Sequence, residues 1–229
     1  MASDPGGAHL YEPLFLPALS ADERRALTAG AVARSFPAGA ALFHQNQVAD
    51  RVLVLQAGFV KLCCITDDGR EVVLGIRGPG DLLGELAAID GSVRSASGIA
   101  LEPVDALAVP AARFGDFLDR HPRVYRVLFQ MLAQRLRDAD RLRVEFASKE
   151  TMGRVAARII EMSERFGSRD EAGIQIEFPL TQEELAGWTA CSRDSVVKAL
   201  QSMRDLGWIE TGRRRITVID LDAIRRRAA

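Results

Sequence analysis

The chain has 229 residues, of which 48% are hydrophobic, and this is enough for one large domain or two smaller ones with sizeable cores. Its formal net charge is −1, so a nucleic-acid-binding surface would have to come from a local basic patch. The sequence has no apolar run near the ~18 residues of a membrane span and no secretory signal at its start. We therefore expect a cytoplasmic protein with no membrane partner.

Cysteines and histidines are few and scattered: they are Cys63, Cys64, Cys191, His9, His44 and His121. Neighbouring Cys63 and Cys64 would point to opposite faces of a strand, which is poor for shared metal ligation, and the odd number of cysteines argues against a disulfide framework. The histidines have no metal-ligand spacing and do not supply a catalytic triad. We predict no catalytic residue, no metal and no cofactor. A jelly-roll enzyme of the cupin type is the alternative that this pattern disfavours, because such an enzyme needs a histidine-rich metal cluster.

Short strands dominate the first half of the chain. Residues 1–11 are predicted to be a disordered lead, and Ser20 with Glu23 forms the capping-box pattern of a short helix. Residues 51–58, 59–65 and 71–77 then favour strands, with the hairpin signal Asp68-Gly69 between the last two. Residues 95–100 and 104–109 continue the series. Many short strands separated by Gly and Pro turns predict a β-sandwich or jelly roll.

The segment 80–96, with the sequence GDLLGELAAIDGSVRSA, combines residues suited to an anion and a sugar. Gly84 allows close backbone approach, and the helix-forming residues after it would direct N–H groups at an anion. Arg94 and Ser95 can donate to phosphate oxygens, whereas Glu85 would accept from a ribose hydroxyl. This pattern suggests a small nucleotide. The alternative is a capping glycine with surface charges.

The order Gly84-Glu85-Leu86-Ala87 followed by Arg94-Ser95-Ala96 resembles the phosphate-binding cassette of cyclic-nucleotide-binding domains, including the sensor domains of Crp/Fnr regulators. The resemblance implies a cyclic nucleotide effector that contacts Gly84, Glu85, Leu86, Arg94 and Ser95. Cyclic AMP is favoured, and cyclic GMP or cyclic di-GMP is possible.

Helical periodicity begins near Pro110. Residues 111–119 predict one helix, and residues 122–147 predict a long one without Gly or Pro. Its apolar residues recur every three or four positions, as in a coiled-coil seam. They are Tyr125, Leu128, Leu132, Leu136, Ala139, Leu142 and Phe146. We expect this helix to form a homodimer, as the resemblance also implies, rather than to pack only on its own domain.

In the resembling family the same helix contacts the purine through a Thr-Ser or Thr-Asn pair. Ala139-Asp140 occupies that place here. Alanine cannot hydrogen-bond through its side chain, so either Asp140 accepts from an adenine amino group or a guanine edge, or nucleotide control has been lost.

The last 80 or so residues have helix-turn-helix signals. Thr181 and Glu184 form a capping box for one helix, Ala190-Cys191 is the turn, and Ser192 caps a second helix over residues 193–206. A hairpin over 209–219 would be the wing. The residues predicted to meet DNA are Thr189, Ser192, Arg193, Asp194, Lys198, Arg213, Arg214 and Arg215.

This segment resembles the winged helix-turn-helix of Crp/Fnr regulators, whose reading helix carries Arg-Glu-x-x-x-Arg. Here the pattern is Arg193-Asp194-x-x-x-Lys198, which keeps the charges but changes their reach. Ala190 replaces a frequent turn glycine, at a cost of about 1 kcal/mol if the backbone there needs positive φ.

We therefore predict an α+β protein with a cyclic-nucleotide-binding jelly roll over 12–120, a dimerisation helix over 121–148 and a winged helix-turn-helix over 149–229. The function implied is a ligand-responsive transcription regulator, not an enzyme, that binds a near-palindromic double-stranded DNA operator as a dimer. The resemblance also implies RNA polymerase as a partner. The alternative is a regulator of the same fold that binds DNA without a nucleotide or with another effector.

Overall fold

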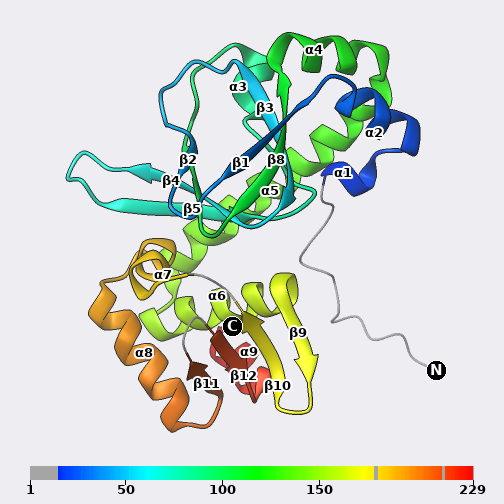
Figure 1. The fold of residues 1–229 in the computed structure, drawn as a ribbon. Coiled ribbons are helices and arrows are strands. Elements are labelled where there is room, and N and C mark those ends of the chain that lie inside the picture. Colours follow the sequence, from blue (N-terminus) through cyan, green and yellow to red (C-terminus); the bar gives the residue numbers. More distant parts are fainter. Residues whose placement is uncertain (1–14, 178–179, 213–214, 229) are drawn as a thin grey trace. The chain divides into compact units, whose positions relative to one another are not determined.

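The computed structural model describes residues 15–177, 180–212 and 215–228 (Figure 1). They divide into two compact units, which we call the sensor unit and the DNA-binding unit. The sensor unit ends at Arg137 and the DNA-binding unit begins at Asp138, so the division falls within the long helix α5 (Pro122–Ser148). Among the described residues, no helix has the length and apolar character needed to cross a membrane.

The sensor unit is built mainly of short antiparallel strands with helices at both chain ends. Its elements in order are α1 (Phe15–Ala18), α2 (Ala21–Thr28), β1 (Val32–Phe36), β2 (Ala41–Phe43), β3 (Arg51–Ala57), β4 (Val60–Ile65), β5 (Glu71–Arg77), β6 (Leu82–Leu83), α3 (Glu85–Asp90), β7 (Ser97–Ala100), β8 (Val104–Pro110), α4 (Ala111–Arg120) and the first part of α5. The capping box expected at Ser20 and Glu23 is present at the start of α2.

Two four-stranded sheets form the β-sandwich, with strand orders β1-β8-β3-β6 and β2-β7-β4-β5. Every pairing is antiparallel, and the β4–β5 hairpin turns at Gly69, whose φ of 80° is the left-handed backbone that the sequence predicted there. One core cluster, including Leu55, Val60 and Ala106, lies between the sheets. A second cluster joins the helices to one sheet and includes Phe114 and Leu128. Leu82 and Leu83 of β6, which precede the loop to β7, are buried in one cluster each.

The DNA-binding unit contains the last turns of α5 and a mixed helical and stranded domain. Its further elements are α6 (Thr151–Phe166), β9 (Gly167–Asp170), β10 (Gly173–Glu177), α7 (Gln182–Thr189), α8 (Arg193–Asp205), β11 (Ile209–Gly212), β12 (Arg215–Val218) and α9 (Leu221–Ala228). Its sheet has the order β11-β12-β10-β9, so the β11–β12 wing continues a sheet. Strand β9 and helix α9 were not predicted. Gly167 follows the last residue of α6 and begins β9 in an extended conformation (φ −76°).

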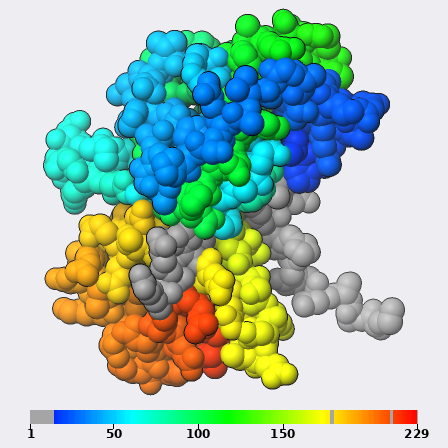
Figure 2. Space-filling view, in the orientation of Figure 1, coloured from blue at the N-terminus to red at the C-terminus, as the bar shows by residue number. Residues whose placement is uncertain are grey.

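The helix-turn-helix prediction is confirmed in its local detail. Thr181 and Glu184 make the reciprocal bonds of a capping box, and the Ser192 hydroxyl accepts from the Ser195 N–H at 3.2 Å. Gly207 follows α8 with φ +71°, a left-handed conformation that ends a helix. In the space-filling view α8 (orange) lies at the surface of its unit (Figure 2).

Candidate nucleotide and DNA-binding sites

Gly84 starts the loop predicted to hold phosphate. Its φ of 77° lies in the left-handed region, and it is the N-cap of α3. A Cβ added at this position would lie 1.9 Å from the Arg94 Nη1 atom. Glycine is therefore required for two reasons, the backbone conformation and the close approach of the Arg94 guanidinium.

Arg94 is only 3% exposed, which is unusual for an arginine. Its Nη1 donates to the Gly84 carbonyl at 2.8 Å, and its Nη2 donates to the Arg51 carbonyl at 2.5 Å. The guanidinium carbon lies 4.8 Å from the centre of the Phe43 ring. The buried Nε has no hydrogen-bond partner among the described residues. Arg94 is thus fixed in place and still has donor capacity for an acceptor that enters the loop.

Burial, with a smaller contribution from Arg51, lowers the pKa of Arg94, while Asp50 and Glu85 oppose that change. A guanidinium that has lost solvent in this way gains from an added anion, because the anion restores stabilisation of the charged form.

Glu85 is 2% exposed and is bound by Arg135 of α5 through a side-chain ion pair. Arg135 also donates from Nη2 to the Leu82 carbonyl at 3.0 Å. Arg135 was not among the residues predicted to form this site. The missed signal was its position on the same helical face as the buried Leu128 and Met131, where a charge needs a partner.

Asp81 adds a further buried carboxylate near this pair. Its Oδ2 accepts from the Gly78 N–H at 2.9 Å, and burial raises its pKa although Arg77 and Arg135 act in the opposite direction. The base of the loop therefore contains a cluster of mutually compensating buried charges.

The remaining residues predicted to bind the ligand are placed differently. Leu86 and Ser95 are exposed beside the loop. A cavity of about 490 Å³ adjoins Arg94, and it is lined by Arg34, Phe36, Leu42, Phe43, Gln47, Val48, Asp50, Arg51, Leu53 and Arg94. Among the predicted ligand residues, only Arg94 lines this cavity. Ala139 and Asp140 belong to the DNA-binding unit, where the exposed Asp140 accepts from Arg143 Nη1 at 2.9 Å.

The start of α8 presents most of the residues predicted to read DNA. Ser192, Arg193, Asp194 and Lys198 are all exposed, on the first two turns of the helix. A helix that exposes a hydroxyl, a guanidinium, a carboxylate and an ammonium within two turns can bond both phosphates and base edges in a major groove.

Thr189 is a correction to the predicted set. It is buried, and its hydroxyl donates to the Leu185 carbonyl at 2.8 Å within α7, so it does not present that group to a phosphate. Ala190 next to it has φ +51°, which confirms that this turn needs a left-handed residue. Arg215 at the start of β12 is exposed, and Arg213 and Arg214 lie outside the described residues.

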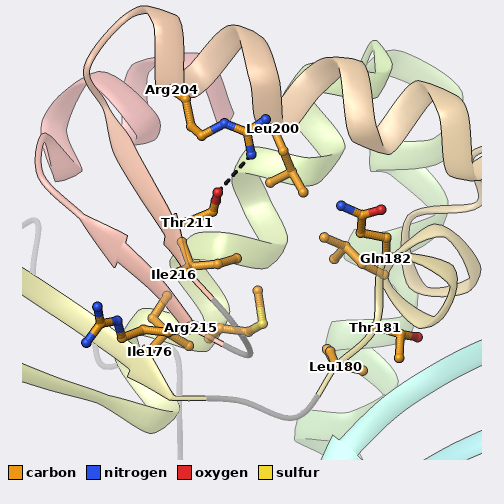
Figure 3. Close-up of a pocket in the computed structure, with 12 residues that line it drawn as sticks. Ile176, Leu180, Thr181, Gln182, Leu200, Arg204, Thr211, Arg215 and Ile216 are labelled. Atoms are coloured by element: carbon orange, nitrogen blue, oxygen red, sulfur yellow. Dashed lines mark hydrogen bonds between the residues drawn. The ribbon is translucent and has the colours of Figure 1, made fainter.

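A hydrogen bond joins the wing to the reading helix α8. Arg204 of α8 donates from Nη1 to the Thr211 hydroxyl of β11 at 2.8 Å (Figure 3). A cavity of about 320 Å³ lies beside this bond, between α7, α8 and the wing, and its apolar lining includes Leu200 and Ile216. The bond restrains the wing relative to α8.

Helix α5 exposes large apolar side chains at heptad-like spacing. Phe129 is 74% exposed, Leu136 is 61% exposed and Val144 is 64% exposed. The predicted seam was wrong at Leu128, which is buried in the sensor core, and it omitted Phe129 and Val144. Tyr125, Leu136 and Phe146 of the predicted seam are exposed, whereas the sensor core covers the face of the helix that carries Leu128.

Comparisons with known proteins match both halves of the chain. Residues 33–121 match the cyclic nucleotide-binding domain family, and residues 153–227 match the Crp-like helix-turn-helix domain family. The fold and these domains define a DNA-binding transcription regulator with a cyclic-nucleotide-binding domain.

Individual relatives agree. A CRP-like cAMP-activated global transcriptional regulator of Mycobacterium tuberculosis is 31% identical, over 84% of this chain and 86% of the relative. The cyclic AMP receptor protein of Thermus thermophilus is 30% identical, over 78% of this chain and 80% of the relative. The solved structure of a CRP/FNR-family regulator from T. thermophilus is 26% identical with a TM-score of 0.71, over 86% of this chain and 98% of that chain. The chain belongs to the Crp/Fnr family of transcription regulators and is not an enzyme.

Proposed function

We propose that this regulator binds a cyclic nucleotide, with cyclic AMP as the favoured effector, through Gly84, Glu85, Leu86, Arg94 and Ser95. The observation that carries the proposal is Arg94: it is buried beside a left-handed glycine, and its Nε lacks a partner among the described residues. A cyclic phosphate would supply the missing acceptor and the missing negative charge. The names of the two relatives described above, both of which refer to cyclic AMP, support the choice of effector.

Glu85 would hold the ribose. Its carboxylate is already bound by Arg135, and a carboxylate has about four lone-pair sites, so it can accept from a sugar hydroxyl as well. Because Arg135 is on α5, a ligand that changes this pair acts directly on the helix that we propose as the dimer interface. Such a ligand shifts the protein between states only by its different affinity for each of them.

The second candidate function is regulation without a nucleotide. Ala139 has no side-chain group to recognise a base, and the charge of Glu85 is already compensated by Arg135 of the same chain. Cyclic GMP and cyclic di-GMP are alternative effectors because Asp140 can accept from a guanine edge.

The proposed assembly is a homodimer through residues 122–147, supported by the exposed Phe129, Leu136 and Val144. Two copies of α8 would then read a near-palindromic operator, with Arg193, Asp194 and Lys198 at base edges and Ser192, Arg213, Arg214 and Arg215 near phosphates. RNA polymerase is a further proposed partner, because the chain belongs to a family of transcription regulators.

Calorimetric titration of the purified protein with cyclic AMP, cyclic GMP and cyclic di-GMP tests the effector. We expect binding of cyclic AMP, and tighter binding of the operator when it is present. Absence of heat with all three, together with operator binding that no nucleotide changes, would establish the second candidate.

The dimer is tested by Leu136→Asp, which places a charge in the exposed stripe. We expect light scattering to report a monomer and operator binding to be lost. Leu74→Asp is the matched control, because Leu74 is another exposed leucine (48%) on a strand of the sensor unit. If Leu136→Asp stays dimeric, the interface lies elsewhere.

A further inference from the structure

The corner between α5 and α6 is only two residues long, Lys149 and Glu150. A connection this short could act as a pivot through its backbone dihedrals. In this structure it is enclosed by side-chain bonds: the Lys149 ammonium bonds the Ala228 carbonyl, and Arg227 Nη2 lies 2.7 Å from Glu150 Oε2. All these residues belong to the DNA-binding unit. The end of α5 is therefore held against α6 and α9 on both sides of the corner.

A buried ion pair fixes the same corner from inside. Arg158 of α6 donates from Nη2 to Glu145 Oε2 of α5 at 2.7 Å and from Nη1 to Glu161 Oε2 at 2.7 Å. The side chains of Arg158 and Glu145 are 4% and 7% exposed. Loss of the Arg158 guanidinium would leave a deeply buried carboxylate on α5 without its main hydrogen-bond partner, which is strongly destabilising.

The same guanidinium reaches the helix-turn-helix. The Arg158 Cζ atom lies 5.5 Å from the ring centre of Trp188, a fully buried residue of α7. A planar guanidinium can bond carboxylates along its edges and an aromatic ring on its face at once. Arg158 therefore contacts the end of the dimer helix and the first helix of the DNA-reading motif simultaneously.

Arg154, one turn earlier on α6, repeats this arrangement. Its Cζ lies 5.9 Å from the ring centre of Phe146 on α5, and its Nη1 donates to the Ala190 carbonyl in the helix-turn-helix turn at 3.3 Å. Arginines four residues apart share one helical face. Two successive turns of α6 thus join the same two elements.

We propose that Arg158, through Glu145 and Trp188 and with Arg154 beside it, is a positioning residue for operator recognition. It fixes the angle between the last turns of α5 and the helix-turn-helix, so that these parts move as one body. In a dimer joined through α5, this angle sets the separation of the two reading helices. The proposal rests on the dimeric operator binding proposed above.

The spacing of operator half-sites gives the readout that mere core packing would not change. The full-length protein would be titrated by fluorescence anisotropy against operators whose half-sites are separated by about 10 bp, and by one base pair more or fewer. Wild type should bind operators of one half-site spacing with about tenfold or higher affinity than the others, because its two reading helices are held at a fixed separation. Arg158→Lys, which keeps the charge but loses the planar fork, should flatten this preference to less than about threefold, with non-specific DNA affinity unchanged.

Glu145→Gln should flatten the spacing preference as Arg158→Lys does, and the double variant should add little, since both changes break one contact. Asp222→Asn, at an exposed residue of α9 in the same unit, is the control and should keep the wild-type preference. Circular dichroism and thermal melting identify any variant that does not fold, and the conservative variants are chosen to avoid this.

An unchanged spacing preference in Arg158→Lys and Glu145→Gln would overturn the proposal. A uniform loss of affinity at every spacing would also overturn it. That result would show that Arg158 stabilises the packing of the unit but does not set the separation of the two reading helices. If wild type itself binds no paired half-sites, the dimeric operator proposal fails instead, and the two failures are thereby distinguished.

Discussion

The loop at Gly84 and the start of α8 differ in whether their charged side chains are buried or exposed. Glu85 and Arg94 are buried and bonded to the protein itself, whereas Arg193 and Lys198 are exposed. A ligand at the loop must share or exchange bonds that already stabilise the sensor unit. The side chains of Arg193 and Lys198, which we propose to meet DNA, are ones that the fold does not depend on. Substitutions in the two regions should therefore separate into those that change stability and those that change binding alone.

Arg135→Met should have the largest effect on stability. It leaves the Glu85 carboxylate buried without its guanidinium partner, and breaking such a pair costs about 3–5 kcal/mol. Urea unfolding followed by circular dichroism measures the loss. Arg143→Met on the same helix removes an exposed pair with Asp140 and should cost less than about 1 kcal/mol. Equal losses would contradict the contrast between buried and exposed charges.

Arg94→Met should weaken cyclic nucleotide binding by roughly 100-fold or more, because hydrogen bonds to charged groups contribute about 1.5–3 kcal/mol each. Calorimetry in the absence of DNA gives the affinity directly. Arg70→Met removes an exposed arginine of the β4–β5 hairpin and should leave binding unchanged. Wild-type affinity in Arg94→Met would place the phosphate elsewhere.

Arg193→Ala should cost about 1–3 kcal/mol of operator affinity, the range for one specific base contact, while the free energy of unfolding stays within about 0.5 kcal/mol of wild type. Anisotropy at fixed salt measures the first and urea unfolding the second. Arg215→Ala is the comparison variant. Loss of a phosphate contact should weaken binding to all DNA sequences alike and reduce the salt dependence of log K by about one. Destabilisation by Arg193→Ala would show that α8 charges also support the fold.

Ala190→Gly should give the smallest change, a stabilisation of about 0.5–1 kcal/mol. The left-handed backbone at φ +51° costs an alanine about 1–2 kcal/mol, and glycine avoids this cost. Part of the resulting stabilisation is lost because glycine has more conformational freedom in the unfolded chain. Urea unfolding measures it. Ala147→Gly in the exposed last turns of α5 should have the opposite sign. A destabilising Ala190→Gly would mean that the turn is held by more than backbone geometry.

Local chemistry explains what the sequence predicted correctly. The caps at Ser20, Thr181 and Ser192 and the turn at Gly69 depend on residues within a few positions of each other, so their patterns are readable along the chain. The helix-turn-helix and the β-sandwich follow from such signals together with apolar periodicity. The roles assigned to the ligand and DNA residues remain predictions.

Long-range partners explain what the sequence did not predict. Glu85 and Arg135 are fifty positions apart, and neither residue alone signals the pair. Strand β9 (Gly167–Asp170) has no alternating apolar residues, and it exists by pairing with β10. Thr189 looked available to DNA because a sequence does not show that its hydroxyl is used inside α7.

The division of the chain inside α5 has a practical consequence for dissecting this protein. A fragment that begins at Thr151, where the DNA-binding fold starts by helix boundaries, would retain Arg158 and Trp188 but lose Glu145 and Phe146. A fragment that begins at Asp138 keeps all four and with them the whole interior of the unit. The longer fragment is therefore the one suited to NMR spectroscopy of DNA binding by the isolated unit. The eleven residues of α5 that it adds are a structural part of the domain that they precede.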